Sequence, residues 1–418
     1  MGRSAERVLV VGGGVVGAAC AYYARLAGRS VTLIDQGEFG RGCSHGNCGF
    51  VCPSHVLPLS GPGVLWNTLK TLTVRNSPLK VRWRFDAALW GWFWRFARNC
   101  NQRDMLATGH ALQGLLASSR SLYDELLTTT LTDVEWTAQG LLFVFRSSAA
   151  MEHYAETYRL LRNEFDLAAT RYDGSALVEL EPALKPGCAG AWHYLTDGHL
   201  RPDKLMVGWR GALIGAGVEI REHCELCDLV VENRLVRGAV TNQGQLPVDQ
   251  LVVATGAWTP RLRRLLRCPV PIQPGKGYSI TMPRPGICPR LPMLFEEHRV
   301  AITPFESGYR IGSTMEFAGY DTTLNPDRLR LLRDGAEIYL REPHAEPVLE
   351  SWYGWRPMTP DGRPYVGPVP ALDNLFVAAG HGMLGVSMSP ATGKLIAELL
   401  SGESPHLDPK LYAVDRQR

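Results

Sequence analysis

Apolar and polar positions follow two different periods along the chain, and these periods separate strand-like segments from helical ones. Residues 8–11 form a continuous apolar run that predicts a buried strand, and residues 15–26 follow with small apolar residues at helical spacing. Residues 30–34 predict a second strand of the same kind. Two more buried strands are predicted far downstream, at 251–254 and 375–379. Strands so widely separated in sequence predict one domain that is assembled from discontinuous segments.

The middle of the chain alternates between helical and strand-rich stretches. Residues 101–162 are predicted to be mostly helical apart from a strand-like stretch at 131–145, and residues 328–341 are again helical. Residues 270–314 form short β-rich runs interrupted by prolines, which is typical of an antiparallel sheet with many turns. A last helix is predicted over 391–400.

Together these elements predict an α/β protein with two domains. The first is a discontinuous Rossmann-like nucleotide-binding domain, and the second is a mixed α+β substrate domain with an antiparallel-rich sheet. The expected segments are 1–80, 190–268 and 350–418 for the nucleotide-binding domain, and 81–189 and 269–349 for the substrate domain.

Composition and charge exclude several classes of protein. The chain has 418 residues, of which 45% are hydrophobic and 20% charged, so it can bury a large core and is not a disordered chain. Its formal net charge of +3 does not indicate a nucleic-acid surface. Apolar runs are too short to span a bilayer, and the first predicted strand begins too early to leave room for a signal peptide. We therefore expect a cytoplasmic protein whose 10 cysteines are reduced.

The turn after the first strand carries the strongest local signal. Gly12 permits a tight turn, Gly14 lets the backbone approach a pyrophosphate, and Gly17 lets the helix pack closely on the strand. The start of the helix, at Val15 and Val16, presents free N–H groups and the positive end of the helix dipole to an anion. This turn predicts a phosphate site.

An acidic residue closes the second strand, as a ribose-binding site requires. Asp35, followed by Gln36, stands where a carboxylate accepts a hydrogen bond from a ribose 2′-hydroxyl and repels a 2′-phosphate. The sequence therefore predicts a dinucleotide site. Residues 251–258 and 375–382 favour FAD as the dinucleotide, because each is a buried strand that runs into a small-residue turn. The helix after the second turn would direct its dipole at a flavin ring.

Six motifs occur in the order that one family shows. They are GGGVVG at 12–17, CSHGNCGFVCPS at 43–54, ATGAW at 254–258, GKGYSI at 275–280, WRPMTPDGRPYVG at 355–367 and GHGMLGVSMSPATGKL at 380–395. Over essentially its whole length the chain resembles the FAD-dependent oxidoreductases of the D-amino-acid oxidase type, and it is most similar to bacterial D-amino-acid dehydrogenases. The segment that begins at Cys43 is similar to that of dehydrogenases acting on D-proline or D-hydroxyproline.

The resemblance implies a D-amino-acid oxidase-like fold and a bound FAD. With the glycine turn and Asp35 included, the FAD-binding residues are expected to be Gly12, Gly14, Val15, Val16, Gly17, Asp35, Gln36, Gly42, Cys43, Ser44, Asn47, Cys48, Gly49, Leu226, Thr255, Gly256, Trp258, Gly380, His381, Gly382, Met383, Leu384 and Gly385. The backbone near Leu226 would reach the adenine.

The segment after the second strand also supports other hypotheses. Cys43, His45, Cys48, Cys52 and His55 lie close together, which suggests a metal site, but the interspersed glycines suit a backbone lying against a flat ring. The resemblance implies flavin contact, with His45 near N5, and we predict no metal. The family usually has small residues in place of Cys43 and Cys48, so a covalent bond from a cysteine or histidine to the flavin stays open.

An amino-acid substrate presents a carboxylate, for which the planar guanidinium of arginine is the best partner. The resemblance assigns this role to Arg356, and the alternative is that Arg356 braces the turn by pairing with Asp361. Tyr278 is predicted as the second carboxylate donor, and Arg310 is a weaker candidate.

The implied reaction is oxidative deamination of a D-amino acid. The neutral amine assists departure of a hydride from Cα to flavin N5, and the protein mainly orients these two atoms. His45 is expected to help keep the amine neutral. The electrons then pass to a quinone or another electron carrier.

Two other functions stay open from the sequence. One is an oxygen-using amine or imino-acid oxidase of the sarcosine or glycine type, in which Lys276 would lie over the flavin and stabilise superoxide. Met383 and Leu384 occupy the stretch where glycine-oxidising relatives carry a second arginine, which argues against glycine. The other is a FAD-binding protein that assembles or modifies a partner without oxidising free amino acids.

Residues 82–98 predict an aromatic, basic helix. One interpretation is a helix buried between the domains, with a basic edge formed by Arg84, Arg95 and Arg98. The other is a peripheral contact with the inner face of the cytoplasmic membrane, where electrons would be delivered to a quinone.

Overall fold

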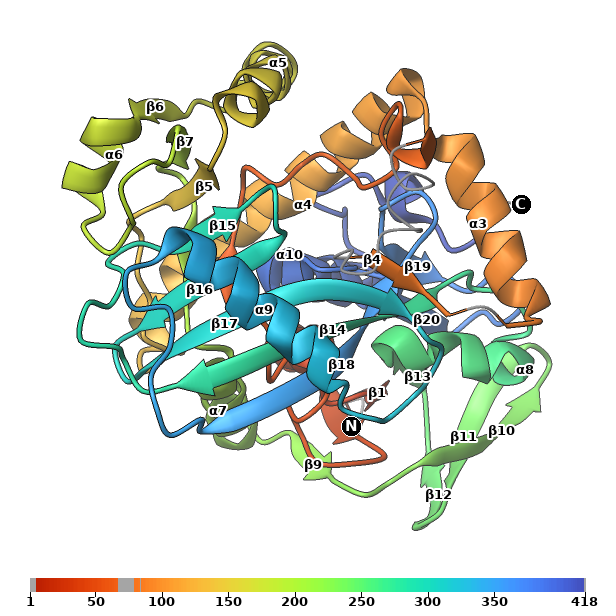
Figure 1. The fold of residues 1–418 in the computed structure, drawn as a ribbon. Coiled ribbons are helices and arrows are strands. Elements are labelled where there is room, and N and C mark those ends of the chain that lie inside the picture. The colour runs from red at the N-terminus through yellow and green to blue at the C-terminus, as the bar shows by residue number, and fades with distance from the viewer. Residues whose placement is uncertain (1–4, 67–78, 83, 417–418) are drawn as a thin grey trace.

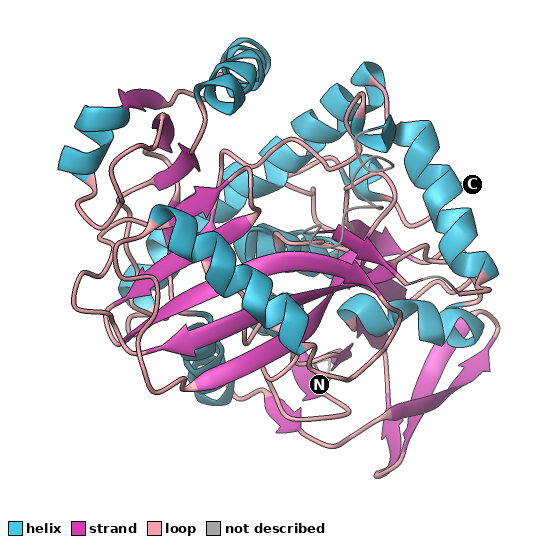
Figure 2. Cartoon of the chain, in the orientation of Figure 1, coloured by secondary structure: helices cyan, strands magenta, loops and turns pink. Residues whose placement is uncertain are grey.

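The fold is that of a computed structural model, which describes residues 5–66, 79–82 and 84–416 (Figure 1). Two large sheets dominate these residues, and helices cover them (Figure 2). One sheet is mostly parallel and the other is mixed, so the predicted α/β fold class with a Rossmann-like part and an antiparallel-rich part is confirmed. Trp83, which belongs to the predicted aromatic helix, lies outside the described residues.

The first large sheet joins segments from the beginning, middle and end of the chain. Its pairings are parallel except for the edge pair β19–β20, which is antiparallel. In spatial order its six strands are β19 (Tyr365–Pro368), β20 (Leu375–Ala379), β13 (Gln250–Val253), β1 (Arg7–Val11), β2 (Ser30–Ile34) and β9 (Glu219–Arg221).

Both faces of this sheet are buried, which explains why its strands are continuous apolar runs. Val8 and Val10 belong to the same core as the helices α1 (Val15–Leu26) and α10 (Gly385–Ser401). Leu9 and Val11 belong to a second core on the other face. That face is covered by a small antiparallel sheet of β10 (Leu226–Glu232), β11 (Leu235–Thr241) and β12 (Gly244–Pro247).

Helices α1 and α10 pack against each other because small residues face the contact. A Cβ at Gly393 would lie 2.6 Å from the backbone carbonyl of Ala19, so the two helices approach more closely than side chains would allow. Helix α1 follows β1 and helix α10 follows β20, so both helices begin near the carboxyl ends of parallel strands of this sheet.

Helix α10 begins at Gly385 rather than at the predicted residue 391. The prediction began the helix after Pro390, and proline has no N–H to donate to the carbonyl four residues earlier. In the structure the hydroxyl of Tyr123 donates a 2.8 Å hydrogen bond to that carbonyl, Val386 O. A contact from a distant helix therefore satisfies the acceptor, and the helix continues through the proline.

The second large sheet is mixed and has nine strands. In spatial order they are β18 (Glu350–Met358), β14 (Gln273–Met282), β17 (Gly308–Phe317), β16 (Val300–Phe305), β15 (Met293–Phe295), β5 (Leu141–Phe145), β7 (Gly190–Tyr194) and β6 (Thr170–Asp173), with β4 (Leu79–Val81) paired to β17. Strands β7 and β18, which begin at the predicted boundaries 190 and 350, belong to this sheet. The predicted strand-like stretch at 131–145 forms a strand only at β5.

The remaining elements surround the two sheets. Helix α9 covers one face of the mixed sheet, and α3 lies at the edge of the molecule (Figure 1). The remaining bounds are α3 (Ala87–Asn99), α4 (Gln102–Thr129), α5 (Ser148–Phe165), α6 (Gly174–Leu180), α7 (Pro202–Gly215), η1 (Gly256–Leu262), α8 (Arg263–Leu266), α9 (Pro326–Tyr339), η2 (Pro409–Tyr412), β3 (Phe50–Val51) and β8 (Gly198–His199).

Candidate active site

The glycine turn between β1 and α1 leaves no room for side chains. Gly12 has φ +113°, and a Cβ there would lie 2.5 Å from the carbonyl oxygen of Ala254 in the turn after β13. A Cβ at Gly17 would lie 1.8 Å from Gly12 O. The turn is therefore held against the neighbouring strand in the tight form that a phosphate-binding turn needs.

The N-terminus of α1 is prepared for an anion. No acidic residue stands in its first turn, and Gly14 at its N-cap has no side chain to cap it. The hydroxyl of Ser44 accepts a hydrogen bond from Val15 N–H at 3.0 Å, which brings the segment after β2 to the helix end. The structure thus joins Gly14, Val15 and Ser44, three of the predicted FAD residues.

Asp35 lies at the carboxyl end of β2, next to the same turn. Its carboxylate accepts hydrogen bonds from Gly13 N–H at 2.6 Å and from Gly37 N–H at 2.8 Å. These bonds orient the carboxylate while leaving lone pairs for a ribose hydroxyl. Gln36 is exposed beside it, and Leu226 is buried in the core that contains Val11.

A second uncapped helix N-terminus lies at α10. Its first turn has no acidic residue and its N-cap residue, Leu384, makes no side-chain cap. Gly380 and Gly382, just before it, have φ +90° and +54°. His381 is buried, which lowers its pKa to about 3, and its Nε2 lies 3.0 Å from the hydroxyl of Thr392. Neutral His381 therefore adds no charge at this helix end.

The residues between these two helix ends fit a bound FAD. A Cβ at Gly42 or at Gly256 would meet no other atom within 4 Å, so the backbone borders open space at both places. Thr255 and Trp258 follow β13 at the carboxyl edge of the sheet, where nucleotides bind in open α/β sheets. Two helix ends, glycine-lined backbone and an oriented carboxylate suit a dinucleotide with one anionic and one flavin end.

The segment from residue 41 to residue 49 is anchored on the mixed sheet. Arg310, which is 1% exposed, donates hydrogen bonds to the carbonyls of His45 at 3.0 Å and Asn47 at 2.7 Å. Thr303 donates a 2.7 Å hydrogen bond to Cys48 O. Arg310 was a candidate for substrate binding, and the structure instead shows it fastening the predicted flavin-binding backbone.

Arg356 lies on the face of the mixed sheet that this segment covers. Its guanidinium lies directly over Gly277, where a Cβ would approach the Arg356 Cζ to 2.3 Å. The guanidinium donates hydrogen bonds to Thr314 O at 2.6 Å and Ser313 O at 3.4 Å. These two acceptors have φ +50° and +114°, so an irregularity in β17 turns both carbonyls toward the arginine.

The charge of Arg356 is not matched by a carboxylate. Among the described residues it forms no ion pair, and Asp361 instead pairs with Arg363 and Arg416. Burial raises the pKa of the Cys43 thiol to about 11 despite the nearby Arg356, so this cysteine stays neutral. A guanidinium that remains protonated, held by two neutral carbonyls, is a prepared site for an anion.

Tyr278 lies on the opposite face of the sheet from Arg356. Residues along β14 alternate between faces, and Gly275 and Gly277 are the ones on the Arg356 side. The Tyr278 hydroxyl donates a 2.8 Å hydrogen bond to Glu316 within the core beneath α9. The structure therefore does not bring Tyr278 to the carboxylate site. Lys276 shares its face and donates to Thr323 O, so the placement does not support an oxygen-activating role for it either.

His45 is paired with a carboxylate at the start of β18. Its Nε2 lies 2.9 Å from Glu350 Oε1, and Arg356 lies six residues further along that strand. Six residues of strand span roughly 20 Å, so Glu350 and Arg356 are well separated along the backbone of β18. Among the described residues, no group of three or more His, Cys, Asp or Glu side chains could hold a metal ion.

We expect the His45–Glu350 pair to contribute to stability rather than to chemistry. The hydrogen bond from His45 lowers the Glu350 pKa, so the pair stabilises the folded protein above the usual pKa of glutamate, near about 4.3. This stabilisation is lost as the pH falls through the lowered pKa. Thermal melts of Glu350→Gln and the parent protein should therefore differ at neutral pH and converge in acid. A difference that grows as the pH falls would contradict this.

Three features of the site escaped the sequence-based prediction. The carbonyls of Ser313 and Thr314 turn toward Arg356 because β17 is irregular there, and no residue pattern in the sequence predicts this irregularity. A Cβ at Gly46 would lie 2.1 Å from the ring of Trp352. The ring therefore packs directly against residues 41–49, which we call the flavin-side segment. The partner of His45, Glu350, was also not predicted, because the sequence shows it only as an acidic residue near a strand.

Comparison with known proteins identifies the family of the chain. The family model described as FAD dependent oxidoreductase matches residues 7–399. The chain is 34% identical to the D-amino acid dehydrogenase of Paramagnetospirillum magneticum, covering 98% of both chains, and 34% identical to that of Methylobacterium nodulans, covering 96% of both.

Solved structures show the same fold at lower identity. The glycine oxidase of Geobacillus kaustophilus aligns with a TM-score of 0.78 at 23% identity, over 99% of this chain and 100% of that one. The L-proline dehydrogenase of P. horikoshii aligns with a TM-score of 0.72 at 20% identity, over 99% and 98%. These two proteins are named for different substrates, so the similarity shows the fold and does not identify the substrate of this chain. The chain belongs to the family of FAD-dependent oxidoreductases.

Proposed function

We propose that this protein is a D-amino-acid dehydrogenase, in which Arg356 binds the substrate carboxylate. The observation that carries the proposal is the partly buried guanidinium with no carboxylate partner among the described residues. The handedness of the substrate rests on the relatives that are named D-amino acid dehydrogenase.

The chain's own residues would bind and orient the substrate. Nη1 and Nη2 of Arg356 each donate one hydrogen bond, to the carbonyls of Thr314 and Ser313, which leaves the other N–H groups of the guanidinium for a carboxylate. Met315 and Met358 lie beside Gly275 on the same face and provide an apolar wall for a side chain or a proline ring. FAD, when bound, would accept the hydride, and with it the two electrons, that leaves the substrate Cα.

Anaerobic mixing with amino acids tests the proposed half-reaction. We expect a D-amino acid or D-imino acid, D-proline and D-hydroxyproline included, to bleach the flavin absorption, and the L-enantiomer to leave it unchanged. Equal bleaching by both enantiomers would refute the stereochemical part. A yellow protein that no amino acid bleaches would favour a FAD-binding protein that serves a partner.

We further propose that the electrons pass to a quinone at a membrane. Helix α3 buries only Leu89 and Trp92 against the mixed sheet, whereas Trp90 and Trp94 are 43% and 60% exposed on its outer side. The Arg98 guanidinium lies 4.7 Å from the Trp94 ring centre, so a cation stands next to an exposed tryptophan on this helix. Tryptophan and arginine side by side suit the boundary between lipid tails and headgroups. In the described part of the chain, every helix is too short or too polar to cross a bilayer.

The acceptor can be tested by comparing oxygen with a short-chain quinone. We expect the reduced flavin to be reoxidised rapidly by the quinone and slowly by oxygen, with little hydrogen peroxide formed. Rapid, stoichiometric peroxide formation would identify an oxidase instead.

A further inference from the structure

The short segment after β13 is an unusually basic part of the surface. Arg261, Arg263, Arg264 and Arg267 all lie within η1 and α8 or directly after them, and all four are exposed. No acidic residue occurs between Asp249 and Glu296. The four arginines form no ion pair among the described residues, whereas other exposed arginines, such as Arg7 and Arg234, are paired with aspartates. We call these four residues the arginine segment.

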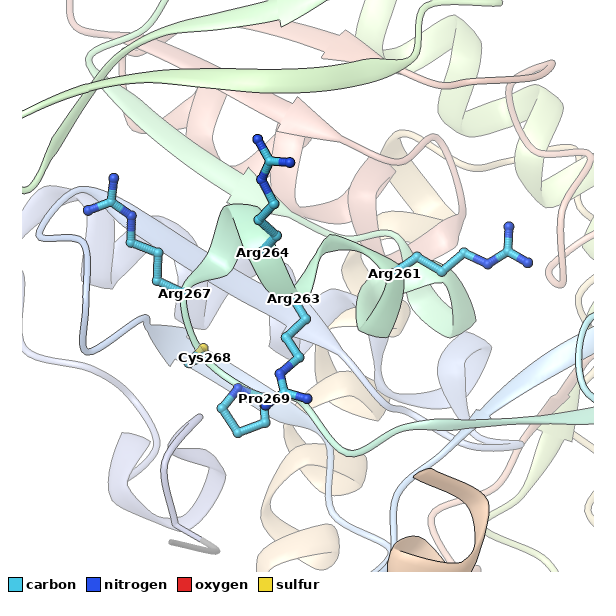
Figure 3. Close-up of a pocket in the computed structure, with 6 residues that line it drawn as sticks. All are labelled: Arg261, Arg263, Arg264, Arg267, Cys268 and Pro269. Carbon is cyan, nitrogen blue, oxygen red and sulfur yellow. The ribbon is translucent and has the colours of Figure 1, made fainter. Parts of the chain in front are cut away.

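The geometry of the arginine segment does not suit a small anion. The four arginines surround a hollow of about 540 Å³ together with Cys268 and Pro269. Figure 3 shows that their guanidinium groups point in different directions rather than toward one point. A compact anion such as phosphate needs donors that converge on it. Diverging cations fit an extended anionic surface.

The arginine segment adjoins the exposed aromatic helix. A second hollow, of about 530 Å³, is lined by Asp86 and Ala88 at the start of α3 and by Arg261 of the arginine segment. Phe85, which precedes α3, is fully exposed. In Figure 1 the lower end of α3 lies next to α8 at one edge of the molecule. The start of α3 and the first arginine of the arginine segment therefore line the same hollow.

We infer that the arginine segment docks on anionic phospholipid headgroups beside α3, so that the protein selects negatively charged membranes. This inference rests on the proposed membrane contact and adds the chemistry of the lipid. Aromatic side chains insert at the headgroup level irrespective of lipid charge, whereas cations near the surface respond to the negative potential of anionic lipids. We favour a membrane over an acidic protein partner because the fully exposed Phe85 directly precedes the α3 residues that share a hollow with Arg261.

Cosedimentation of the holoenzyme with vesicles tests the inference. Vesicles of phosphatidylcholine alone are compared with vesicles that also contain phosphatidylglycerol. We expect tighter binding to the second kind. The triple variant Arg263→Gln, Arg264→Gln, Arg267→Gln should lose this preference and bind on the order of 100-fold more weakly, because each arginine near an anionic surface contributes about fivefold in affinity. Arg261 is left unchanged because it lies over the rings of Trp258 and Tyr320.

A charge-matched control lies at the other end of the molecule. The variant Arg159→Gln, Arg162→Gln, Arg171→Gln removes the same charge from α5 and β6, far from α3 in Figure 1, and should bind vesicles like the parent protein. Both triple variants should keep flavin reduction by substrate, since the substituted arginines are outside the site.

The outcomes separate this inference from the membrane contact itself. The variant Trp90→Ser, Trp94→Ser should weaken binding to both kinds of vesicle. Equal binding of the parent protein to neutral and anionic vesicles would overturn the lipid preference and leave the contact standing. No binding to either kind would overturn both. Arginine-dependent binding to polyglutamate without vesicle binding would show that the arginine segment docks an acidic protein instead.

Discussion

Replacing Arg356 with alanine is expected to lower kcat/KM for the amino-acid substrate by about 10³-fold, because a buried charge-assisted pair would lose one partner. Of the three predicted carboxylate ligands, Tyr278 faces α9 and Arg310 binds the carbonyls of His45 and Asn47. The Arg356 guanidinium lies over Gly277 and forms no ion pair among the described residues. The rate of anaerobic flavin bleaching as a function of substrate concentration measures the effect.

Two comparisons make this prediction specific to the carboxylate. Arg356→Lys keeps the charge but loses the planar fork, so it should recover only part of the rate. Added guanidinium ion should partly restore Arg356→Ala and leave Arg356→Lys unchanged. FAD content and the melting temperature should not fall in Arg356→Ala, since the variant removes an unpaired charge. Full activity of Arg356→Ala at an unchanged KM would refute the assignment.

Replacing Gly17 with alanine is expected to abolish FAD binding. The new Cβ would lie 1.8 Å from Gly12 O, so α1 must move away from the turn that binds the pyrophosphate. Neither atom can yield locally, because Gly12 is itself held against Ala254 O. Overpacking of this kind costs about 1–3 kcal/mol or more, and here it displaces the anion site as well. Flavin absorbance of the purified protein and titration with FAD measure the loss.

A second glycine provides the control for Gly17→Ala. Gly211 lies inside α7, is exposed, and a Cβ there would meet no other atom within 4 Å. Gly211→Ala should therefore keep FAD and stabilise the fold by about 0.5–1 kcal/mol, as alanine does in helix interiors. If Gly17→Ala bound FAD like Gly211→Ala, the tight contact between α1 and the turn would not matter for the cofactor.

Local sequence was sufficient for the nucleotide-binding half. The strand before Gly12, the glycine turn and the acid at Asp35 are neighbours in sequence, and each has a backbone or side-chain requirement that only a few residue types meet. The buried runs at β13 and β20 were recognisable because parallel strands covered on both faces are apolar throughout. These features alone predict where the cofactor binds.

Contacts between distant segments decided the rest. Residues on both sides of β14 are buried, and the register with β18 shows that Arg356 faces the flavin-side segment while Tyr278 faces α9. Likewise, Pro390 would end a helix in isolation, but hydrogen bonds from the hydroxyls of Tyr123, which belongs to α4, and of Ser389 satisfy the freed carbonyl. Periodicity along one segment shows which residues share a face of a strand or helix, but it does not show which face lies toward the substrate. That choice depends on pairing and packing between segments that are far apart in the chain.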